Sequence, residues 1–263
     1  MEIRDCDVLL TGATGGIGHA LARALAARGA KLLLTGRRSE VLEALADELG
    51  ARALSVDLAD RAALDRLIET ATGVDILVAN AGLPATGTLD DFTVEEIDRA
   101  IDVNLRAAVL LARALAEPMR QRRSGHMVFM SSLAGKAPSP WASVYCATKF
   151  GLRGFALSLR ADLRDDNVGV SVIYPGPVAD AGMFADSGVG IPLGIRPSSP
   201  DKVARAVIGA IERNRAEVSV SALPLRAGTA LASAAPSVAA VAARRLGADR
   251  VARDLALNQR DKR

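Results

Sequence analysis

The chain has 263 residues, of which 50% are hydrophobic and 3% aromatic, and its formal net charge is +3. This length fits a single α/β domain, and the scarcity of aromatic residues means a core built mainly from Ala, Leu and Val. Residues 241–263 include seven basic and three acidic residues, which leaves 26 basic and 27 acidic residues for the rest. The excess charge therefore belongs to the C-terminal end, and nucleic-acid binding by the main body is not expected.

The first residues and the few cysteines exclude several classes of protein. The opening segment, MEIRDCDVLL, mixes charges with a short apolar run and does not fit a secretory signal peptide. No stretch reaches the roughly 18 apolar residues of a membrane span. Two cysteines (Cys6, Cys146) and two histidines (His19, His126) are too few for a disulfide framework or a metal site. We expect a cytoplasmic protein that binds no metal.

Short apolar runs alternate along the chain with segments of helical periodicity, which is the pattern of β-α-β units. Strands are predicted at residues 6–11, 31–35, 52–56, 75–79, 126–131, 169–174 and 217–220. Helices are predicted at residues 16–28, 39–49, 61–70, 94–122, 142–165 and 201–214. The sequence therefore predicts a doubly wound, seven-stranded parallel sheet in a single α/β domain.

Two segments depart from this alternation. Residues 179–200 are rich in Gly and Pro yet include Met183, Phe184, Val189 and Ile191. An apolar loop of this length after a strand predicts a lid. The segment 224–263 is rich in Ala and then basic, which indicates a helical segment followed by a tail.

A glycine-rich turn, VLLTGATGGIGHALARAL, leads from the first predicted strand into the first helix. Such a turn lets the backbone approach a pyrophosphate, and the helix N-terminus presents N–H groups to it. Gly12, Gly15 and Gly18 fit one known spacing, whereas Gly12, Gly16 and Gly18 fit another. A turn that merely packs the helix on the strand is the alternative, but the strand before it and the helix after it favour dinucleotide binding.

The end of the second predicted strand, LLLTGRRSE, indicates which dinucleotide is bound. An acid here binds the 2′-hydroxyl of NAD, whereas Arg accommodates the 2′-phosphate of NADP. Gly36 stands where an acid would be expected, and Arg37 and Arg38 follow it. Guanidinium groups match phosphate oxygens. The sequence predicts NADP(H) in preference to NAD(H), with two solvated arginines at a helix start as the alternative.

Five motifs, in order, make the chain resemble the short-chain dehydrogenases/reductases. They are the glycine turn, LVANAG (77–82), the Asn of IDVNL (Asn104), SSLAGKAPSPWASVYCATK (131–149) and YPGPV (174–178). The resemblance implies a Rossmann-type dinucleotide-binding and catalytic domain over residues 1–223, with the lid at about 179–200 and the C-terminal segment at 224–263. It also favours the spacing Gly12, Gly16 and Gly18, because members with the other spacing usually carry a larger C-terminal substrate domain.

Carried over residue by residue, the resemblance implies both cofactor-binding and catalytic residues. The implied cofactor-binding residues are Gly12, Thr14, Gly15, Gly16, Ile17, Gly18, Arg37, Asp57, Leu58, Asn80, Ala81, Gly82, Tyr145, Lys149, Pro175, Gly176 and Val178. The implied catalytic residues are Asn104, Ser132, Tyr145 and Lys149. In the family's pattern Asp57 contacts adenine, Asn104 holds a water in the proton path, and Ser132 fits the serine position better than Ser131.

Position 180 departs from that pattern. Members commonly have Thr two residues after the Val of PGPV, where it binds the nicotinamide carboxamide, whereas this chain has Asp180. An ionised Asp can accept a hydrogen bond from the carboxamide NH₂ but cannot donate one to its oxygen. The sequence leaves this nicotinamide contact open.

Tyr145 and Lys149 lie four residues apart in a predicted helix and therefore share one face. A cation close to a phenol lowers its pKa from about 10 and makes it a better acid–base catalyst near neutrality. We therefore expect Tyr145 to act as general acid/base in the reduction of a ketone to a secondary alcohol, or the reverse, with Ser132 polarising the carbonyl. The apolar lid favours an apolar substrate, for instance a 3-oxoacyl compound.

Two alternatives concern what the chain binds. A member without chemistry could bind nucleotide as a regulator or scaffold, although the presence of all four catalytic residues argues against this. The segment 224–263 could contact a membrane or a partner, or pack on its own domain.

The predicted helices 94–122 and 142–165 are apolar around much of their circumference, and family members commonly associate through them, so we expect a homodimer or homotetramer. Trp141 could line the site or pack at the start of its helix.

Overall fold

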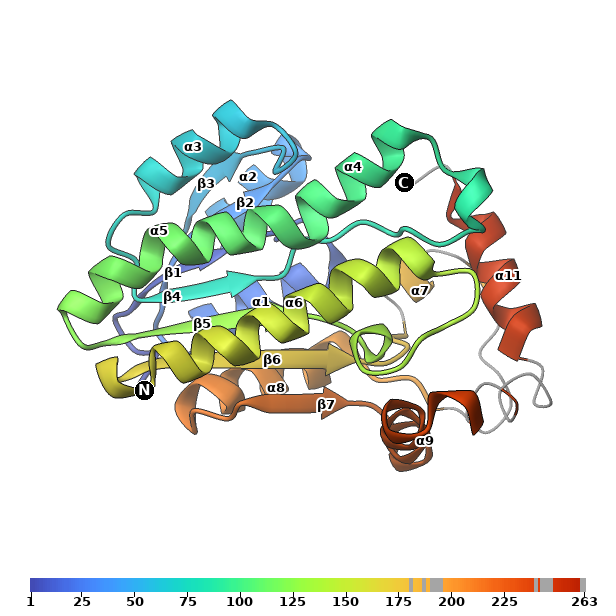
Figure 1. Cartoon of the computed structure of the whole chain (residues 1–263). Helices are drawn as coiled ribbons and strands as arrows, with labels where there is room; N and C mark the ends of the chain where they lie inside the picture. Colours follow the sequence, from blue (N-terminus) through green and yellow to red (C-terminus); the bar gives the residue numbers. More distant parts are fainter. Residues whose placement is uncertain (180–181, 186–187, 190–195, 239–240, 242–247, 261–263) are drawn as a thin grey trace.

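A computed structural model describes residues 1–179, 182–185, 188–189, 196–238, 241 and 248–260. A seven-stranded sheet forms its centre, in the order β3-β2-β1-β4-β5-β6-β7, with every pair of neighbours parallel (Figure 1). The strands are β1 (Asp7–Leu10), β2 (Lys31–Gly36), β3 (Arg52–Ser55), β4 (Ile76–Ala79), β5 (Gly125–Met130), β6 (Val168–Pro175) and β7 (Glu217–Val220). The order changes direction between β1 and β4, so the predicted doubly wound, single-domain fold is confirmed.

Helices cover both faces of the sheet (Figure 1). One face carries α1 (Gly16–Ala26), α2 (Ser39–Leu49) and α8 (Pro200–Glu212), and the other carries α3 (Arg61–Thr70), α5 (Ala107–Gln121) and α6 (Ser143–Asp162). Side chains of β1 alternate between the two layers: Val8 and Leu10 pack with the first set of helices and Leu9 with the second.

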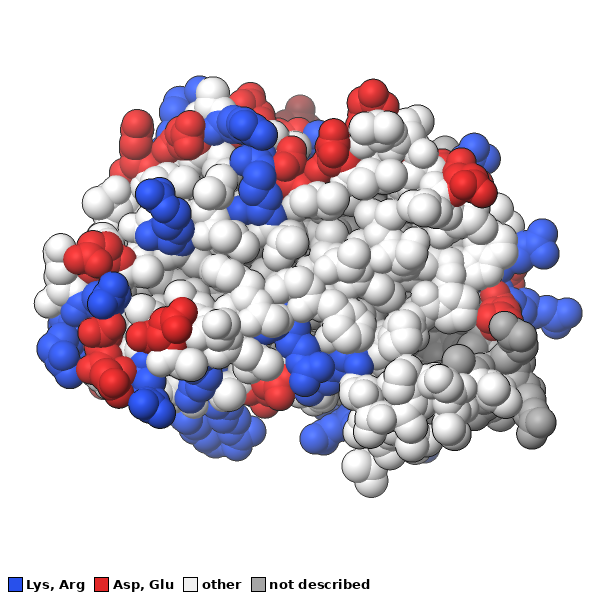
Figure 2. All heavy atoms as spheres, viewed as in Figure 1, with Lys and Arg blue, Asp and Glu red and all other residues white. Residues whose placement is uncertain are grey.

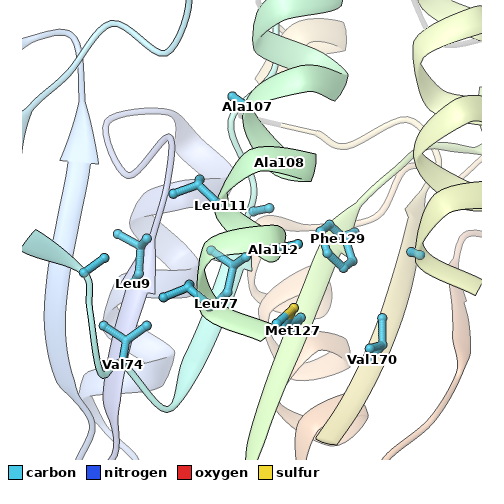
Figure 3. Packing of buried hydrophobic residues seen from close by; sticks show 14 of the residues in the cluster. Leu9, Val74, Leu77, Ala107, Ala108, Leu111, Ala112, Met127, Phe129 and Val170 are labelled. Carbon is cyan, nitrogen blue, oxygen red and sulfur yellow. The ribbon is translucent and has the colours of Figure 1, made fainter. Parts of the chain in front are cut away.

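The layer under α5 shows how a core poor in aromatic residues is filled (Figure 3). Small side chains of α5, Ala108 and Ala112, let the helix lie close to the sheet, where Leu111 packs among strand residues. Phe129 of β5 contacts Phe155 of α6 edge to face, with ring centroids 5.7 Å apart. This packing holds the strands that carry the site at their carboxyl ends.

The predicted helix 94–122 is interrupted, which corrects the sequence-based expectation. It consists of α4 (Val94–Ile101), a π-helical turn (Asp102–Arg106) and α5. A capping box starts α4, because Thr93 and Glu96 each bond the other's backbone N–H. The π turn contains Asn104, whose side chain is bonded to the backbone of Leu83 on a neighbouring loop. Such wider turns inside helices often occur at functional sites.

Three further helices are α7 (Gly182–Ala185), α9 (Leu223–Ala234) and α11 (Ala248–Asn258). The last two lie within the segment for which the sequence predicts helical structure. Figure 2 shows few charged side chains over α9 on the face in view, and Leu223 and Leu231 are exposed there. Among the described residues, no helix has both the length and the apolar character that crossing a membrane requires.

Candidate active site

The glycine turn joins β1 to α1, and at two of its positions, Gly12 and Gly18, a side chain would clash with the backbone. Gly12 has φ +68°, and a Cβ there would lie 2.8 Å from Ala81 Cα. A Cβ at Gly18 would lie 2.1 Å from the Gly12 carbonyl oxygen. Gly15, the N-cap of α1, has no side chain to satisfy the N–H groups of the first turn. These groups can bind an anion, so a dinucleotide pyrophosphate fits the turn.

The loop after β4 is bonded directly to this turn. Thr11 Oγ1 accepts hydrogen bonds from the backbone N–H groups of Asn80 and Ala81, each at 3.1 Å. Asn80 Nδ2 donates to the carbonyls of Thr11 at 3.0 Å and Gly12 at 3.1 Å. The predicted residues Asn80 and Ala81 are therefore held against the glycines. The sequence reasoning did not single out Thr11, although its place just before the first glycine was a usable signal.

Asp57, which follows β3, lies in a cluster of charges. Its carboxylate accepts hydrogen bonds from Arg99 Nη2 at 2.8 Å and from the Ala59 N–H at 3.0 Å. Partial burial acts to raise the pKa of this carboxyl, but the two hydrogen bonds and the positive charges of Arg99 and Arg37 outweigh it and lower the pKa. Asp57 is thus ionised at neutral pH. Arg99 comes from α4, and no local pattern in the sequence pointed to it.

The residues after β2 leave this end of the site positive. A Cβ on Gly36 would lie 2.7 Å from Thr14 Cγ2, so an acidic side chain at this position would require Thr14 to move. Arg38 donates a hydrogen bond to the Thr14 carbonyl and is thereby attached to the glycine turn. Arg37 is exposed, and its charge acts on Asp57. A guanidinium therefore follows β2 here, and Gly36 brings no acidic side chain to the end of that strand.

Ser132 and Tyr145 come together although thirteen residues separate them. Ser132 follows β5 in an extended conformation and caps a short 3₁₀ turn, Leu133–Gly135, with its Oγ accepting from the Ala134 N–H at 3.2 Å. Tyr145 lies in the first turn of α6, close enough to Ser132 for the serine side chain to act on the pKa of the phenol. Burial raises the pKa of Tyr145 to about 12, while the nearby Ser132 side chain acts to lower it. The phenol therefore carries its proton at neutral pH.

The neighbouring serine has a different position. Ser131 is 5% exposed and its Oγ donates to the Lys149 carbonyl at 3.0 Å. This bond attaches the end of β5 to α6 and leaves Ser132 as the serine beside Tyr145.

Lys149 lies near Tyr145 and is 2% exposed. Its Nζ donates to the Met130 carbonyl at 2.9 Å and lies 5.7 Å from the centroid of the Tyr145 ring. Burial lowers the pKa of Lys149 to about 8, so the ammonium is still mostly charged at pH 7. The pKa of Tyr145 is nevertheless raised, and not lowered as the sequence suggested, because burial of the phenol outweighs the other influences on it.

Asn104 and Lys149 both lie close to Gly82. Asn104 Oδ1 accepts from the Leu83 N–H at 2.6 Å, and Asn104 Nδ2 donates to the Leu83 carbonyl at 3.0 Å. A Cβ on Gly82 would lie 3.3 Å from Asn104 Oδ1 and 3.5 Å from Lys149 Nζ. Two polar side-chain groups thus lie close to the bare Cα of Gly82.

Three predicted residues lie at the end of β6 or just after it, at the carboxyl ends of the strands. Pro175 ends the strand, and the Gly176 N–H donates to the Val220 carbonyl at 3.0 Å. Val178 is 4% exposed and forms a β-bridge with Ser198. The chain is therefore anchored on both sides of the predicted lid.

The remaining predicted residues have mixed positions. Leu58 is buried in the core, and the Ile17 side chain lies 3.5 Å from where a Cβ of Gly182 in α7 would stand. Asp180 and Ile191 lie outside the described residues.

Comparisons with known proteins agree with this arrangement. The family model described as short chain dehydrogenase matches residues 7–189. "Ketoacyl reductase HetN" of Nostoc sp. is 34% identical over 227 residues, 83% of this chain and 79% of that protein. The short-chain dehydrogenase from Sphingobium yanoikuyae, solved in complex with NADPH, is 28% identical with a TM-score of 0.75, over 91% of this chain and 94% of that one. A serine dehydrogenase solved with NADP⁺ is 31% identical with a TM-score of 0.74, over 83% and 95%. The chain belongs to the short-chain dehydrogenases/reductases, a family of oxidoreductases that use NAD(P)H.

Proposed function

We propose that this enzyme reduces a ketone to a secondary alcohol with NADPH, and that Tyr145 is the general acid. The closeness of the Tyr145 and Ser132 side chains carries the proposal. It places two hydroxyl groups next to each other, so that both can donate to one carbonyl oxygen as negative charge develops there. A phenol pKa of about 12 keeps the proton on Tyr145 until that charge appears.

Each group has one role in this scheme. A bound reduced nicotinamide supplies the hydride to the carbonyl carbon. Ser132 orients and polarises the carbonyl, and Tyr145 Oη transfers its proton to the oxygen that becomes the hydroxyl. The Lys149 ammonium stabilises the phenolate that remains. A water beside Gly82, between Asn104 Oδ1 and Lys149 Nζ, returns a proton to Tyr145; in the reverse reaction the same groups remove one.

The preference for NADPH rests on the adenosine end. Gly12, Gly16 and Gly18 would hold the pyrophosphate, and Arg37 would pair with the 2′-phosphate. The clash that a side chain at position 36 makes with Thr14 supports this, since it disfavours the acid that NAD binding requires. Two related structures named above contain NADPH or NADP⁺.

The substrate is proposed to be an apolar ketone, with 3-oxoacyl compounds as the first to test. The apolar side chain of Met183 lies near Gly82, and the Nostoc relative is called a ketoacyl reductase. We also propose a homodimer or homotetramer, which is supported by the exposed apolar side chains of Ile101, at the end of α4, and Phe150, within α6.

The test compares the only two tyrosines of the chain. Tyr145→Phe keeps the ring and removes the proton, and we expect turnover to fall by about 10²–10⁴-fold. Tyr174→Phe is the matched control, because that hydroxyl bonds Glu217 at 2.5 Å. NADPH oxidation with a panel of apolar ketones measures turnover, and fluorescence titration measures NADPH binding, which both variants should retain.

Near wild-type turnover by Tyr145→Phe would contradict the mechanism. Binding of NADPH by the wild type without turnover of any carbonyl compound would instead favour a non-catalytic nucleotide-binding role.

A further inference from the structure

Gln259, just beyond α11, joins two segments that border the catalytic residues. Its side chain is 2% exposed. Its Oε1 accepts from Thr86 Oγ1 at 2.9 Å, and its Nε2 donates to the Met183 carbonyl at 2.5 Å. A carbonyl can only accept, so the amide nitrogen must face Met183 and the orientation of the amide follows from chemistry. One buried side chain thus connects the C-terminal segment to α7 and to the loop after β4.

Met183, which Gln259 contacts, lies close to the polar groups proposed to return the proton to Tyr145. Met183 Cε lies 3.9 Å from the position of a Cβ on Gly82. That same position is within 3.5 Å of Lys149 Nζ and Asn104 Oδ1. Holding the Met183 carbonyl therefore holds an apolar side chain beside the polar groups that the mechanism uses.

The Thr86 end reaches Tyr145. The Ala85 carbonyl accepts from the Tyr145 N–H at 3.2 Å, and the Gly87 N–H donates to the Trp141 carbonyl at 2.6 Å. Thr86 lies between these two residues, so the loop that Gln259 contacts is attached to the start of α6.

A second contact attaches α11 to Trp141, shortly before the start of α6. The Arg253 guanidinium of α11 lies 5.8 Å from the centroid of the Trp141 ring. This distance is within the range of a cation–π interaction. Trp141 has φ +58°, an uncommon conformation for a bulky residue. The C-terminal segment therefore contacts the start of α6, the loop after β4 and α7 (Figure 1).

We propose that Gln259 is a positioning residue for the substrate: it fixes Met183 over the carbonyl site and so sets the KM for the ketone, while cofactor affinity is left to the glycine turn. This inference rests on the proposed function. Removing the amide leaves the Met183 carbonyl without its buried donor. Losing a buried hydrogen-bond partner changes an equilibrium constant by roughly tenfold or more.

Four variants separate the two ends of the bridge. Gln259→Leu removes both bonds, and Gln259→Glu keeps an acceptor for Thr86 but places a carboxylate against the Met183 carbonyl. Thr86→Val removes only the hydroxyl, and Thr86→Ser retains it. Gln121→Leu is the matched control, since Gln121 is exposed on α5 and bonds Glu117 of the same helix.

We expect Gln259→Leu and Gln259→Glu to raise the ketone KM by about tenfold with kcat changed less than about threefold, and Thr86→Val to raise it by about threefold. Thr86→Ser and Gln121→Leu should match the wild type, and the Kd for NADPH should stay within about twofold in every variant. An unchanged ketone KM in the Gln259 variants, or an equal loss of NADPH affinity, overturns the positioning role. If Gln259→Leu does not fold, the comparison of Thr86→Val with Thr86→Ser decides the same question.

A readout without turnover keeps this result distinct from a failure of the proposed function. Trp141 is the only tryptophan, so acrylamide quenching of its fluorescence reports the docking of α11. Gln259→Leu should increase quenching, and Gln121→Leu should not. Unchanged quenching overturns the bridge whether or not any ketone is reduced. Increased quenching in a protein that reduces no carbonyl compound supports the bridge and counts against the proposed reaction alone.

Discussion

The two sides of the site are held in different ways. The floor, which we define as residues 11–18, 80–82, Ser132, Tyr145 and Lys149, is built on a central strand, its turns and a long helix, and backbone groups make most of its contacts. The roof, residues 182–185 and 248–259, is attached through side chains such as Gln259, which bonds Thr86 across 173 positions in the chain. Rigid elements thus carry the proposed chemistry, while a few long-range side-chain contacts shape the side proposed to meet the substrate.

The largest expected effect comes from substituting Gly18, which belongs to the floor. In Gly18→Ala the added Cβ would stand 2.1 Å from the Gly12 carbonyl, a backbone atom that cannot move alone. We expect the free energy of unfolding to fall by about 3 kcal/mol and NADPH binding to be lost. Gly15→Ala is the control for stability, because its Cβ would meet nothing closer than 3.6 Å and its φ is −82°. Urea denaturation measures both variants, and equal midpoints would show that the turn is more adaptable than its geometry implies.

A second prediction separates stability from function within the floor. Lys149→Met should abolish turnover yet raise the free energy of unfolding at pH 7 by about 2–3 kcal/mol, because it removes a buried ammonium whose pKa is lowered to about 8. Between the folded pKa of about 8 and the unfolded value of 10.5, the unfolded wild type binds more protons than the folded protein. Wild-type stability therefore rises with pH in that window, and the advantage of the variant shrinks.

Unfolding at several pH values between about 7 and 10 measures this difference. Lys202→Met, at an exposed position, should show no such trend. A variant that is less stable than the wild type at pH 7 would mean that the bond from Lys149 to Met130 outweighs the cost of burying the charge.

The smallest expected effect lies at the rim of the floor, where Arg37 is exposed. Arg37→Ser should lower the preference for NADPH over NADH by about tenfold, which corresponds to about 1.4 kcal/mol. Added salt should reduce the preference of the wild type as well, since exposed charges are screened. Ratios of KM for the two cofactors measure this, with Arg113→Ser on α5 as the control. An unchanged ratio would leave Arg38 as the residue to test.

Local patterns predicted the sheet and most helices well. The bounds predicted for α2, α3 and β7 match the structure, because each has a clear period and a turn or cap at its ends. The interruption at Asn104 was not predicted, and the side chain of Asn104 is bonded to Leu83, 21 residues away, which no local pattern shows. Arg99 and Gln259 were missed for the same reason: each acts on a residue that no local spacing connects to it.

The sequence by itself determined the family and the glycine turn, and it singled out Ser132, Tyr145 and Lys149 as candidate catalytic residues, because these depend on residue type and on spacing within one or two elements. Only the tertiary structure decided the electrostatics and the roof. Burial, which is a property of the whole packed domain, raises the pKa of Tyr145 and lowers that of Lys149. The contact of Gln259 with Thr86 and Met183 exists only because the fold brings three distant segments to one edge of the sheet.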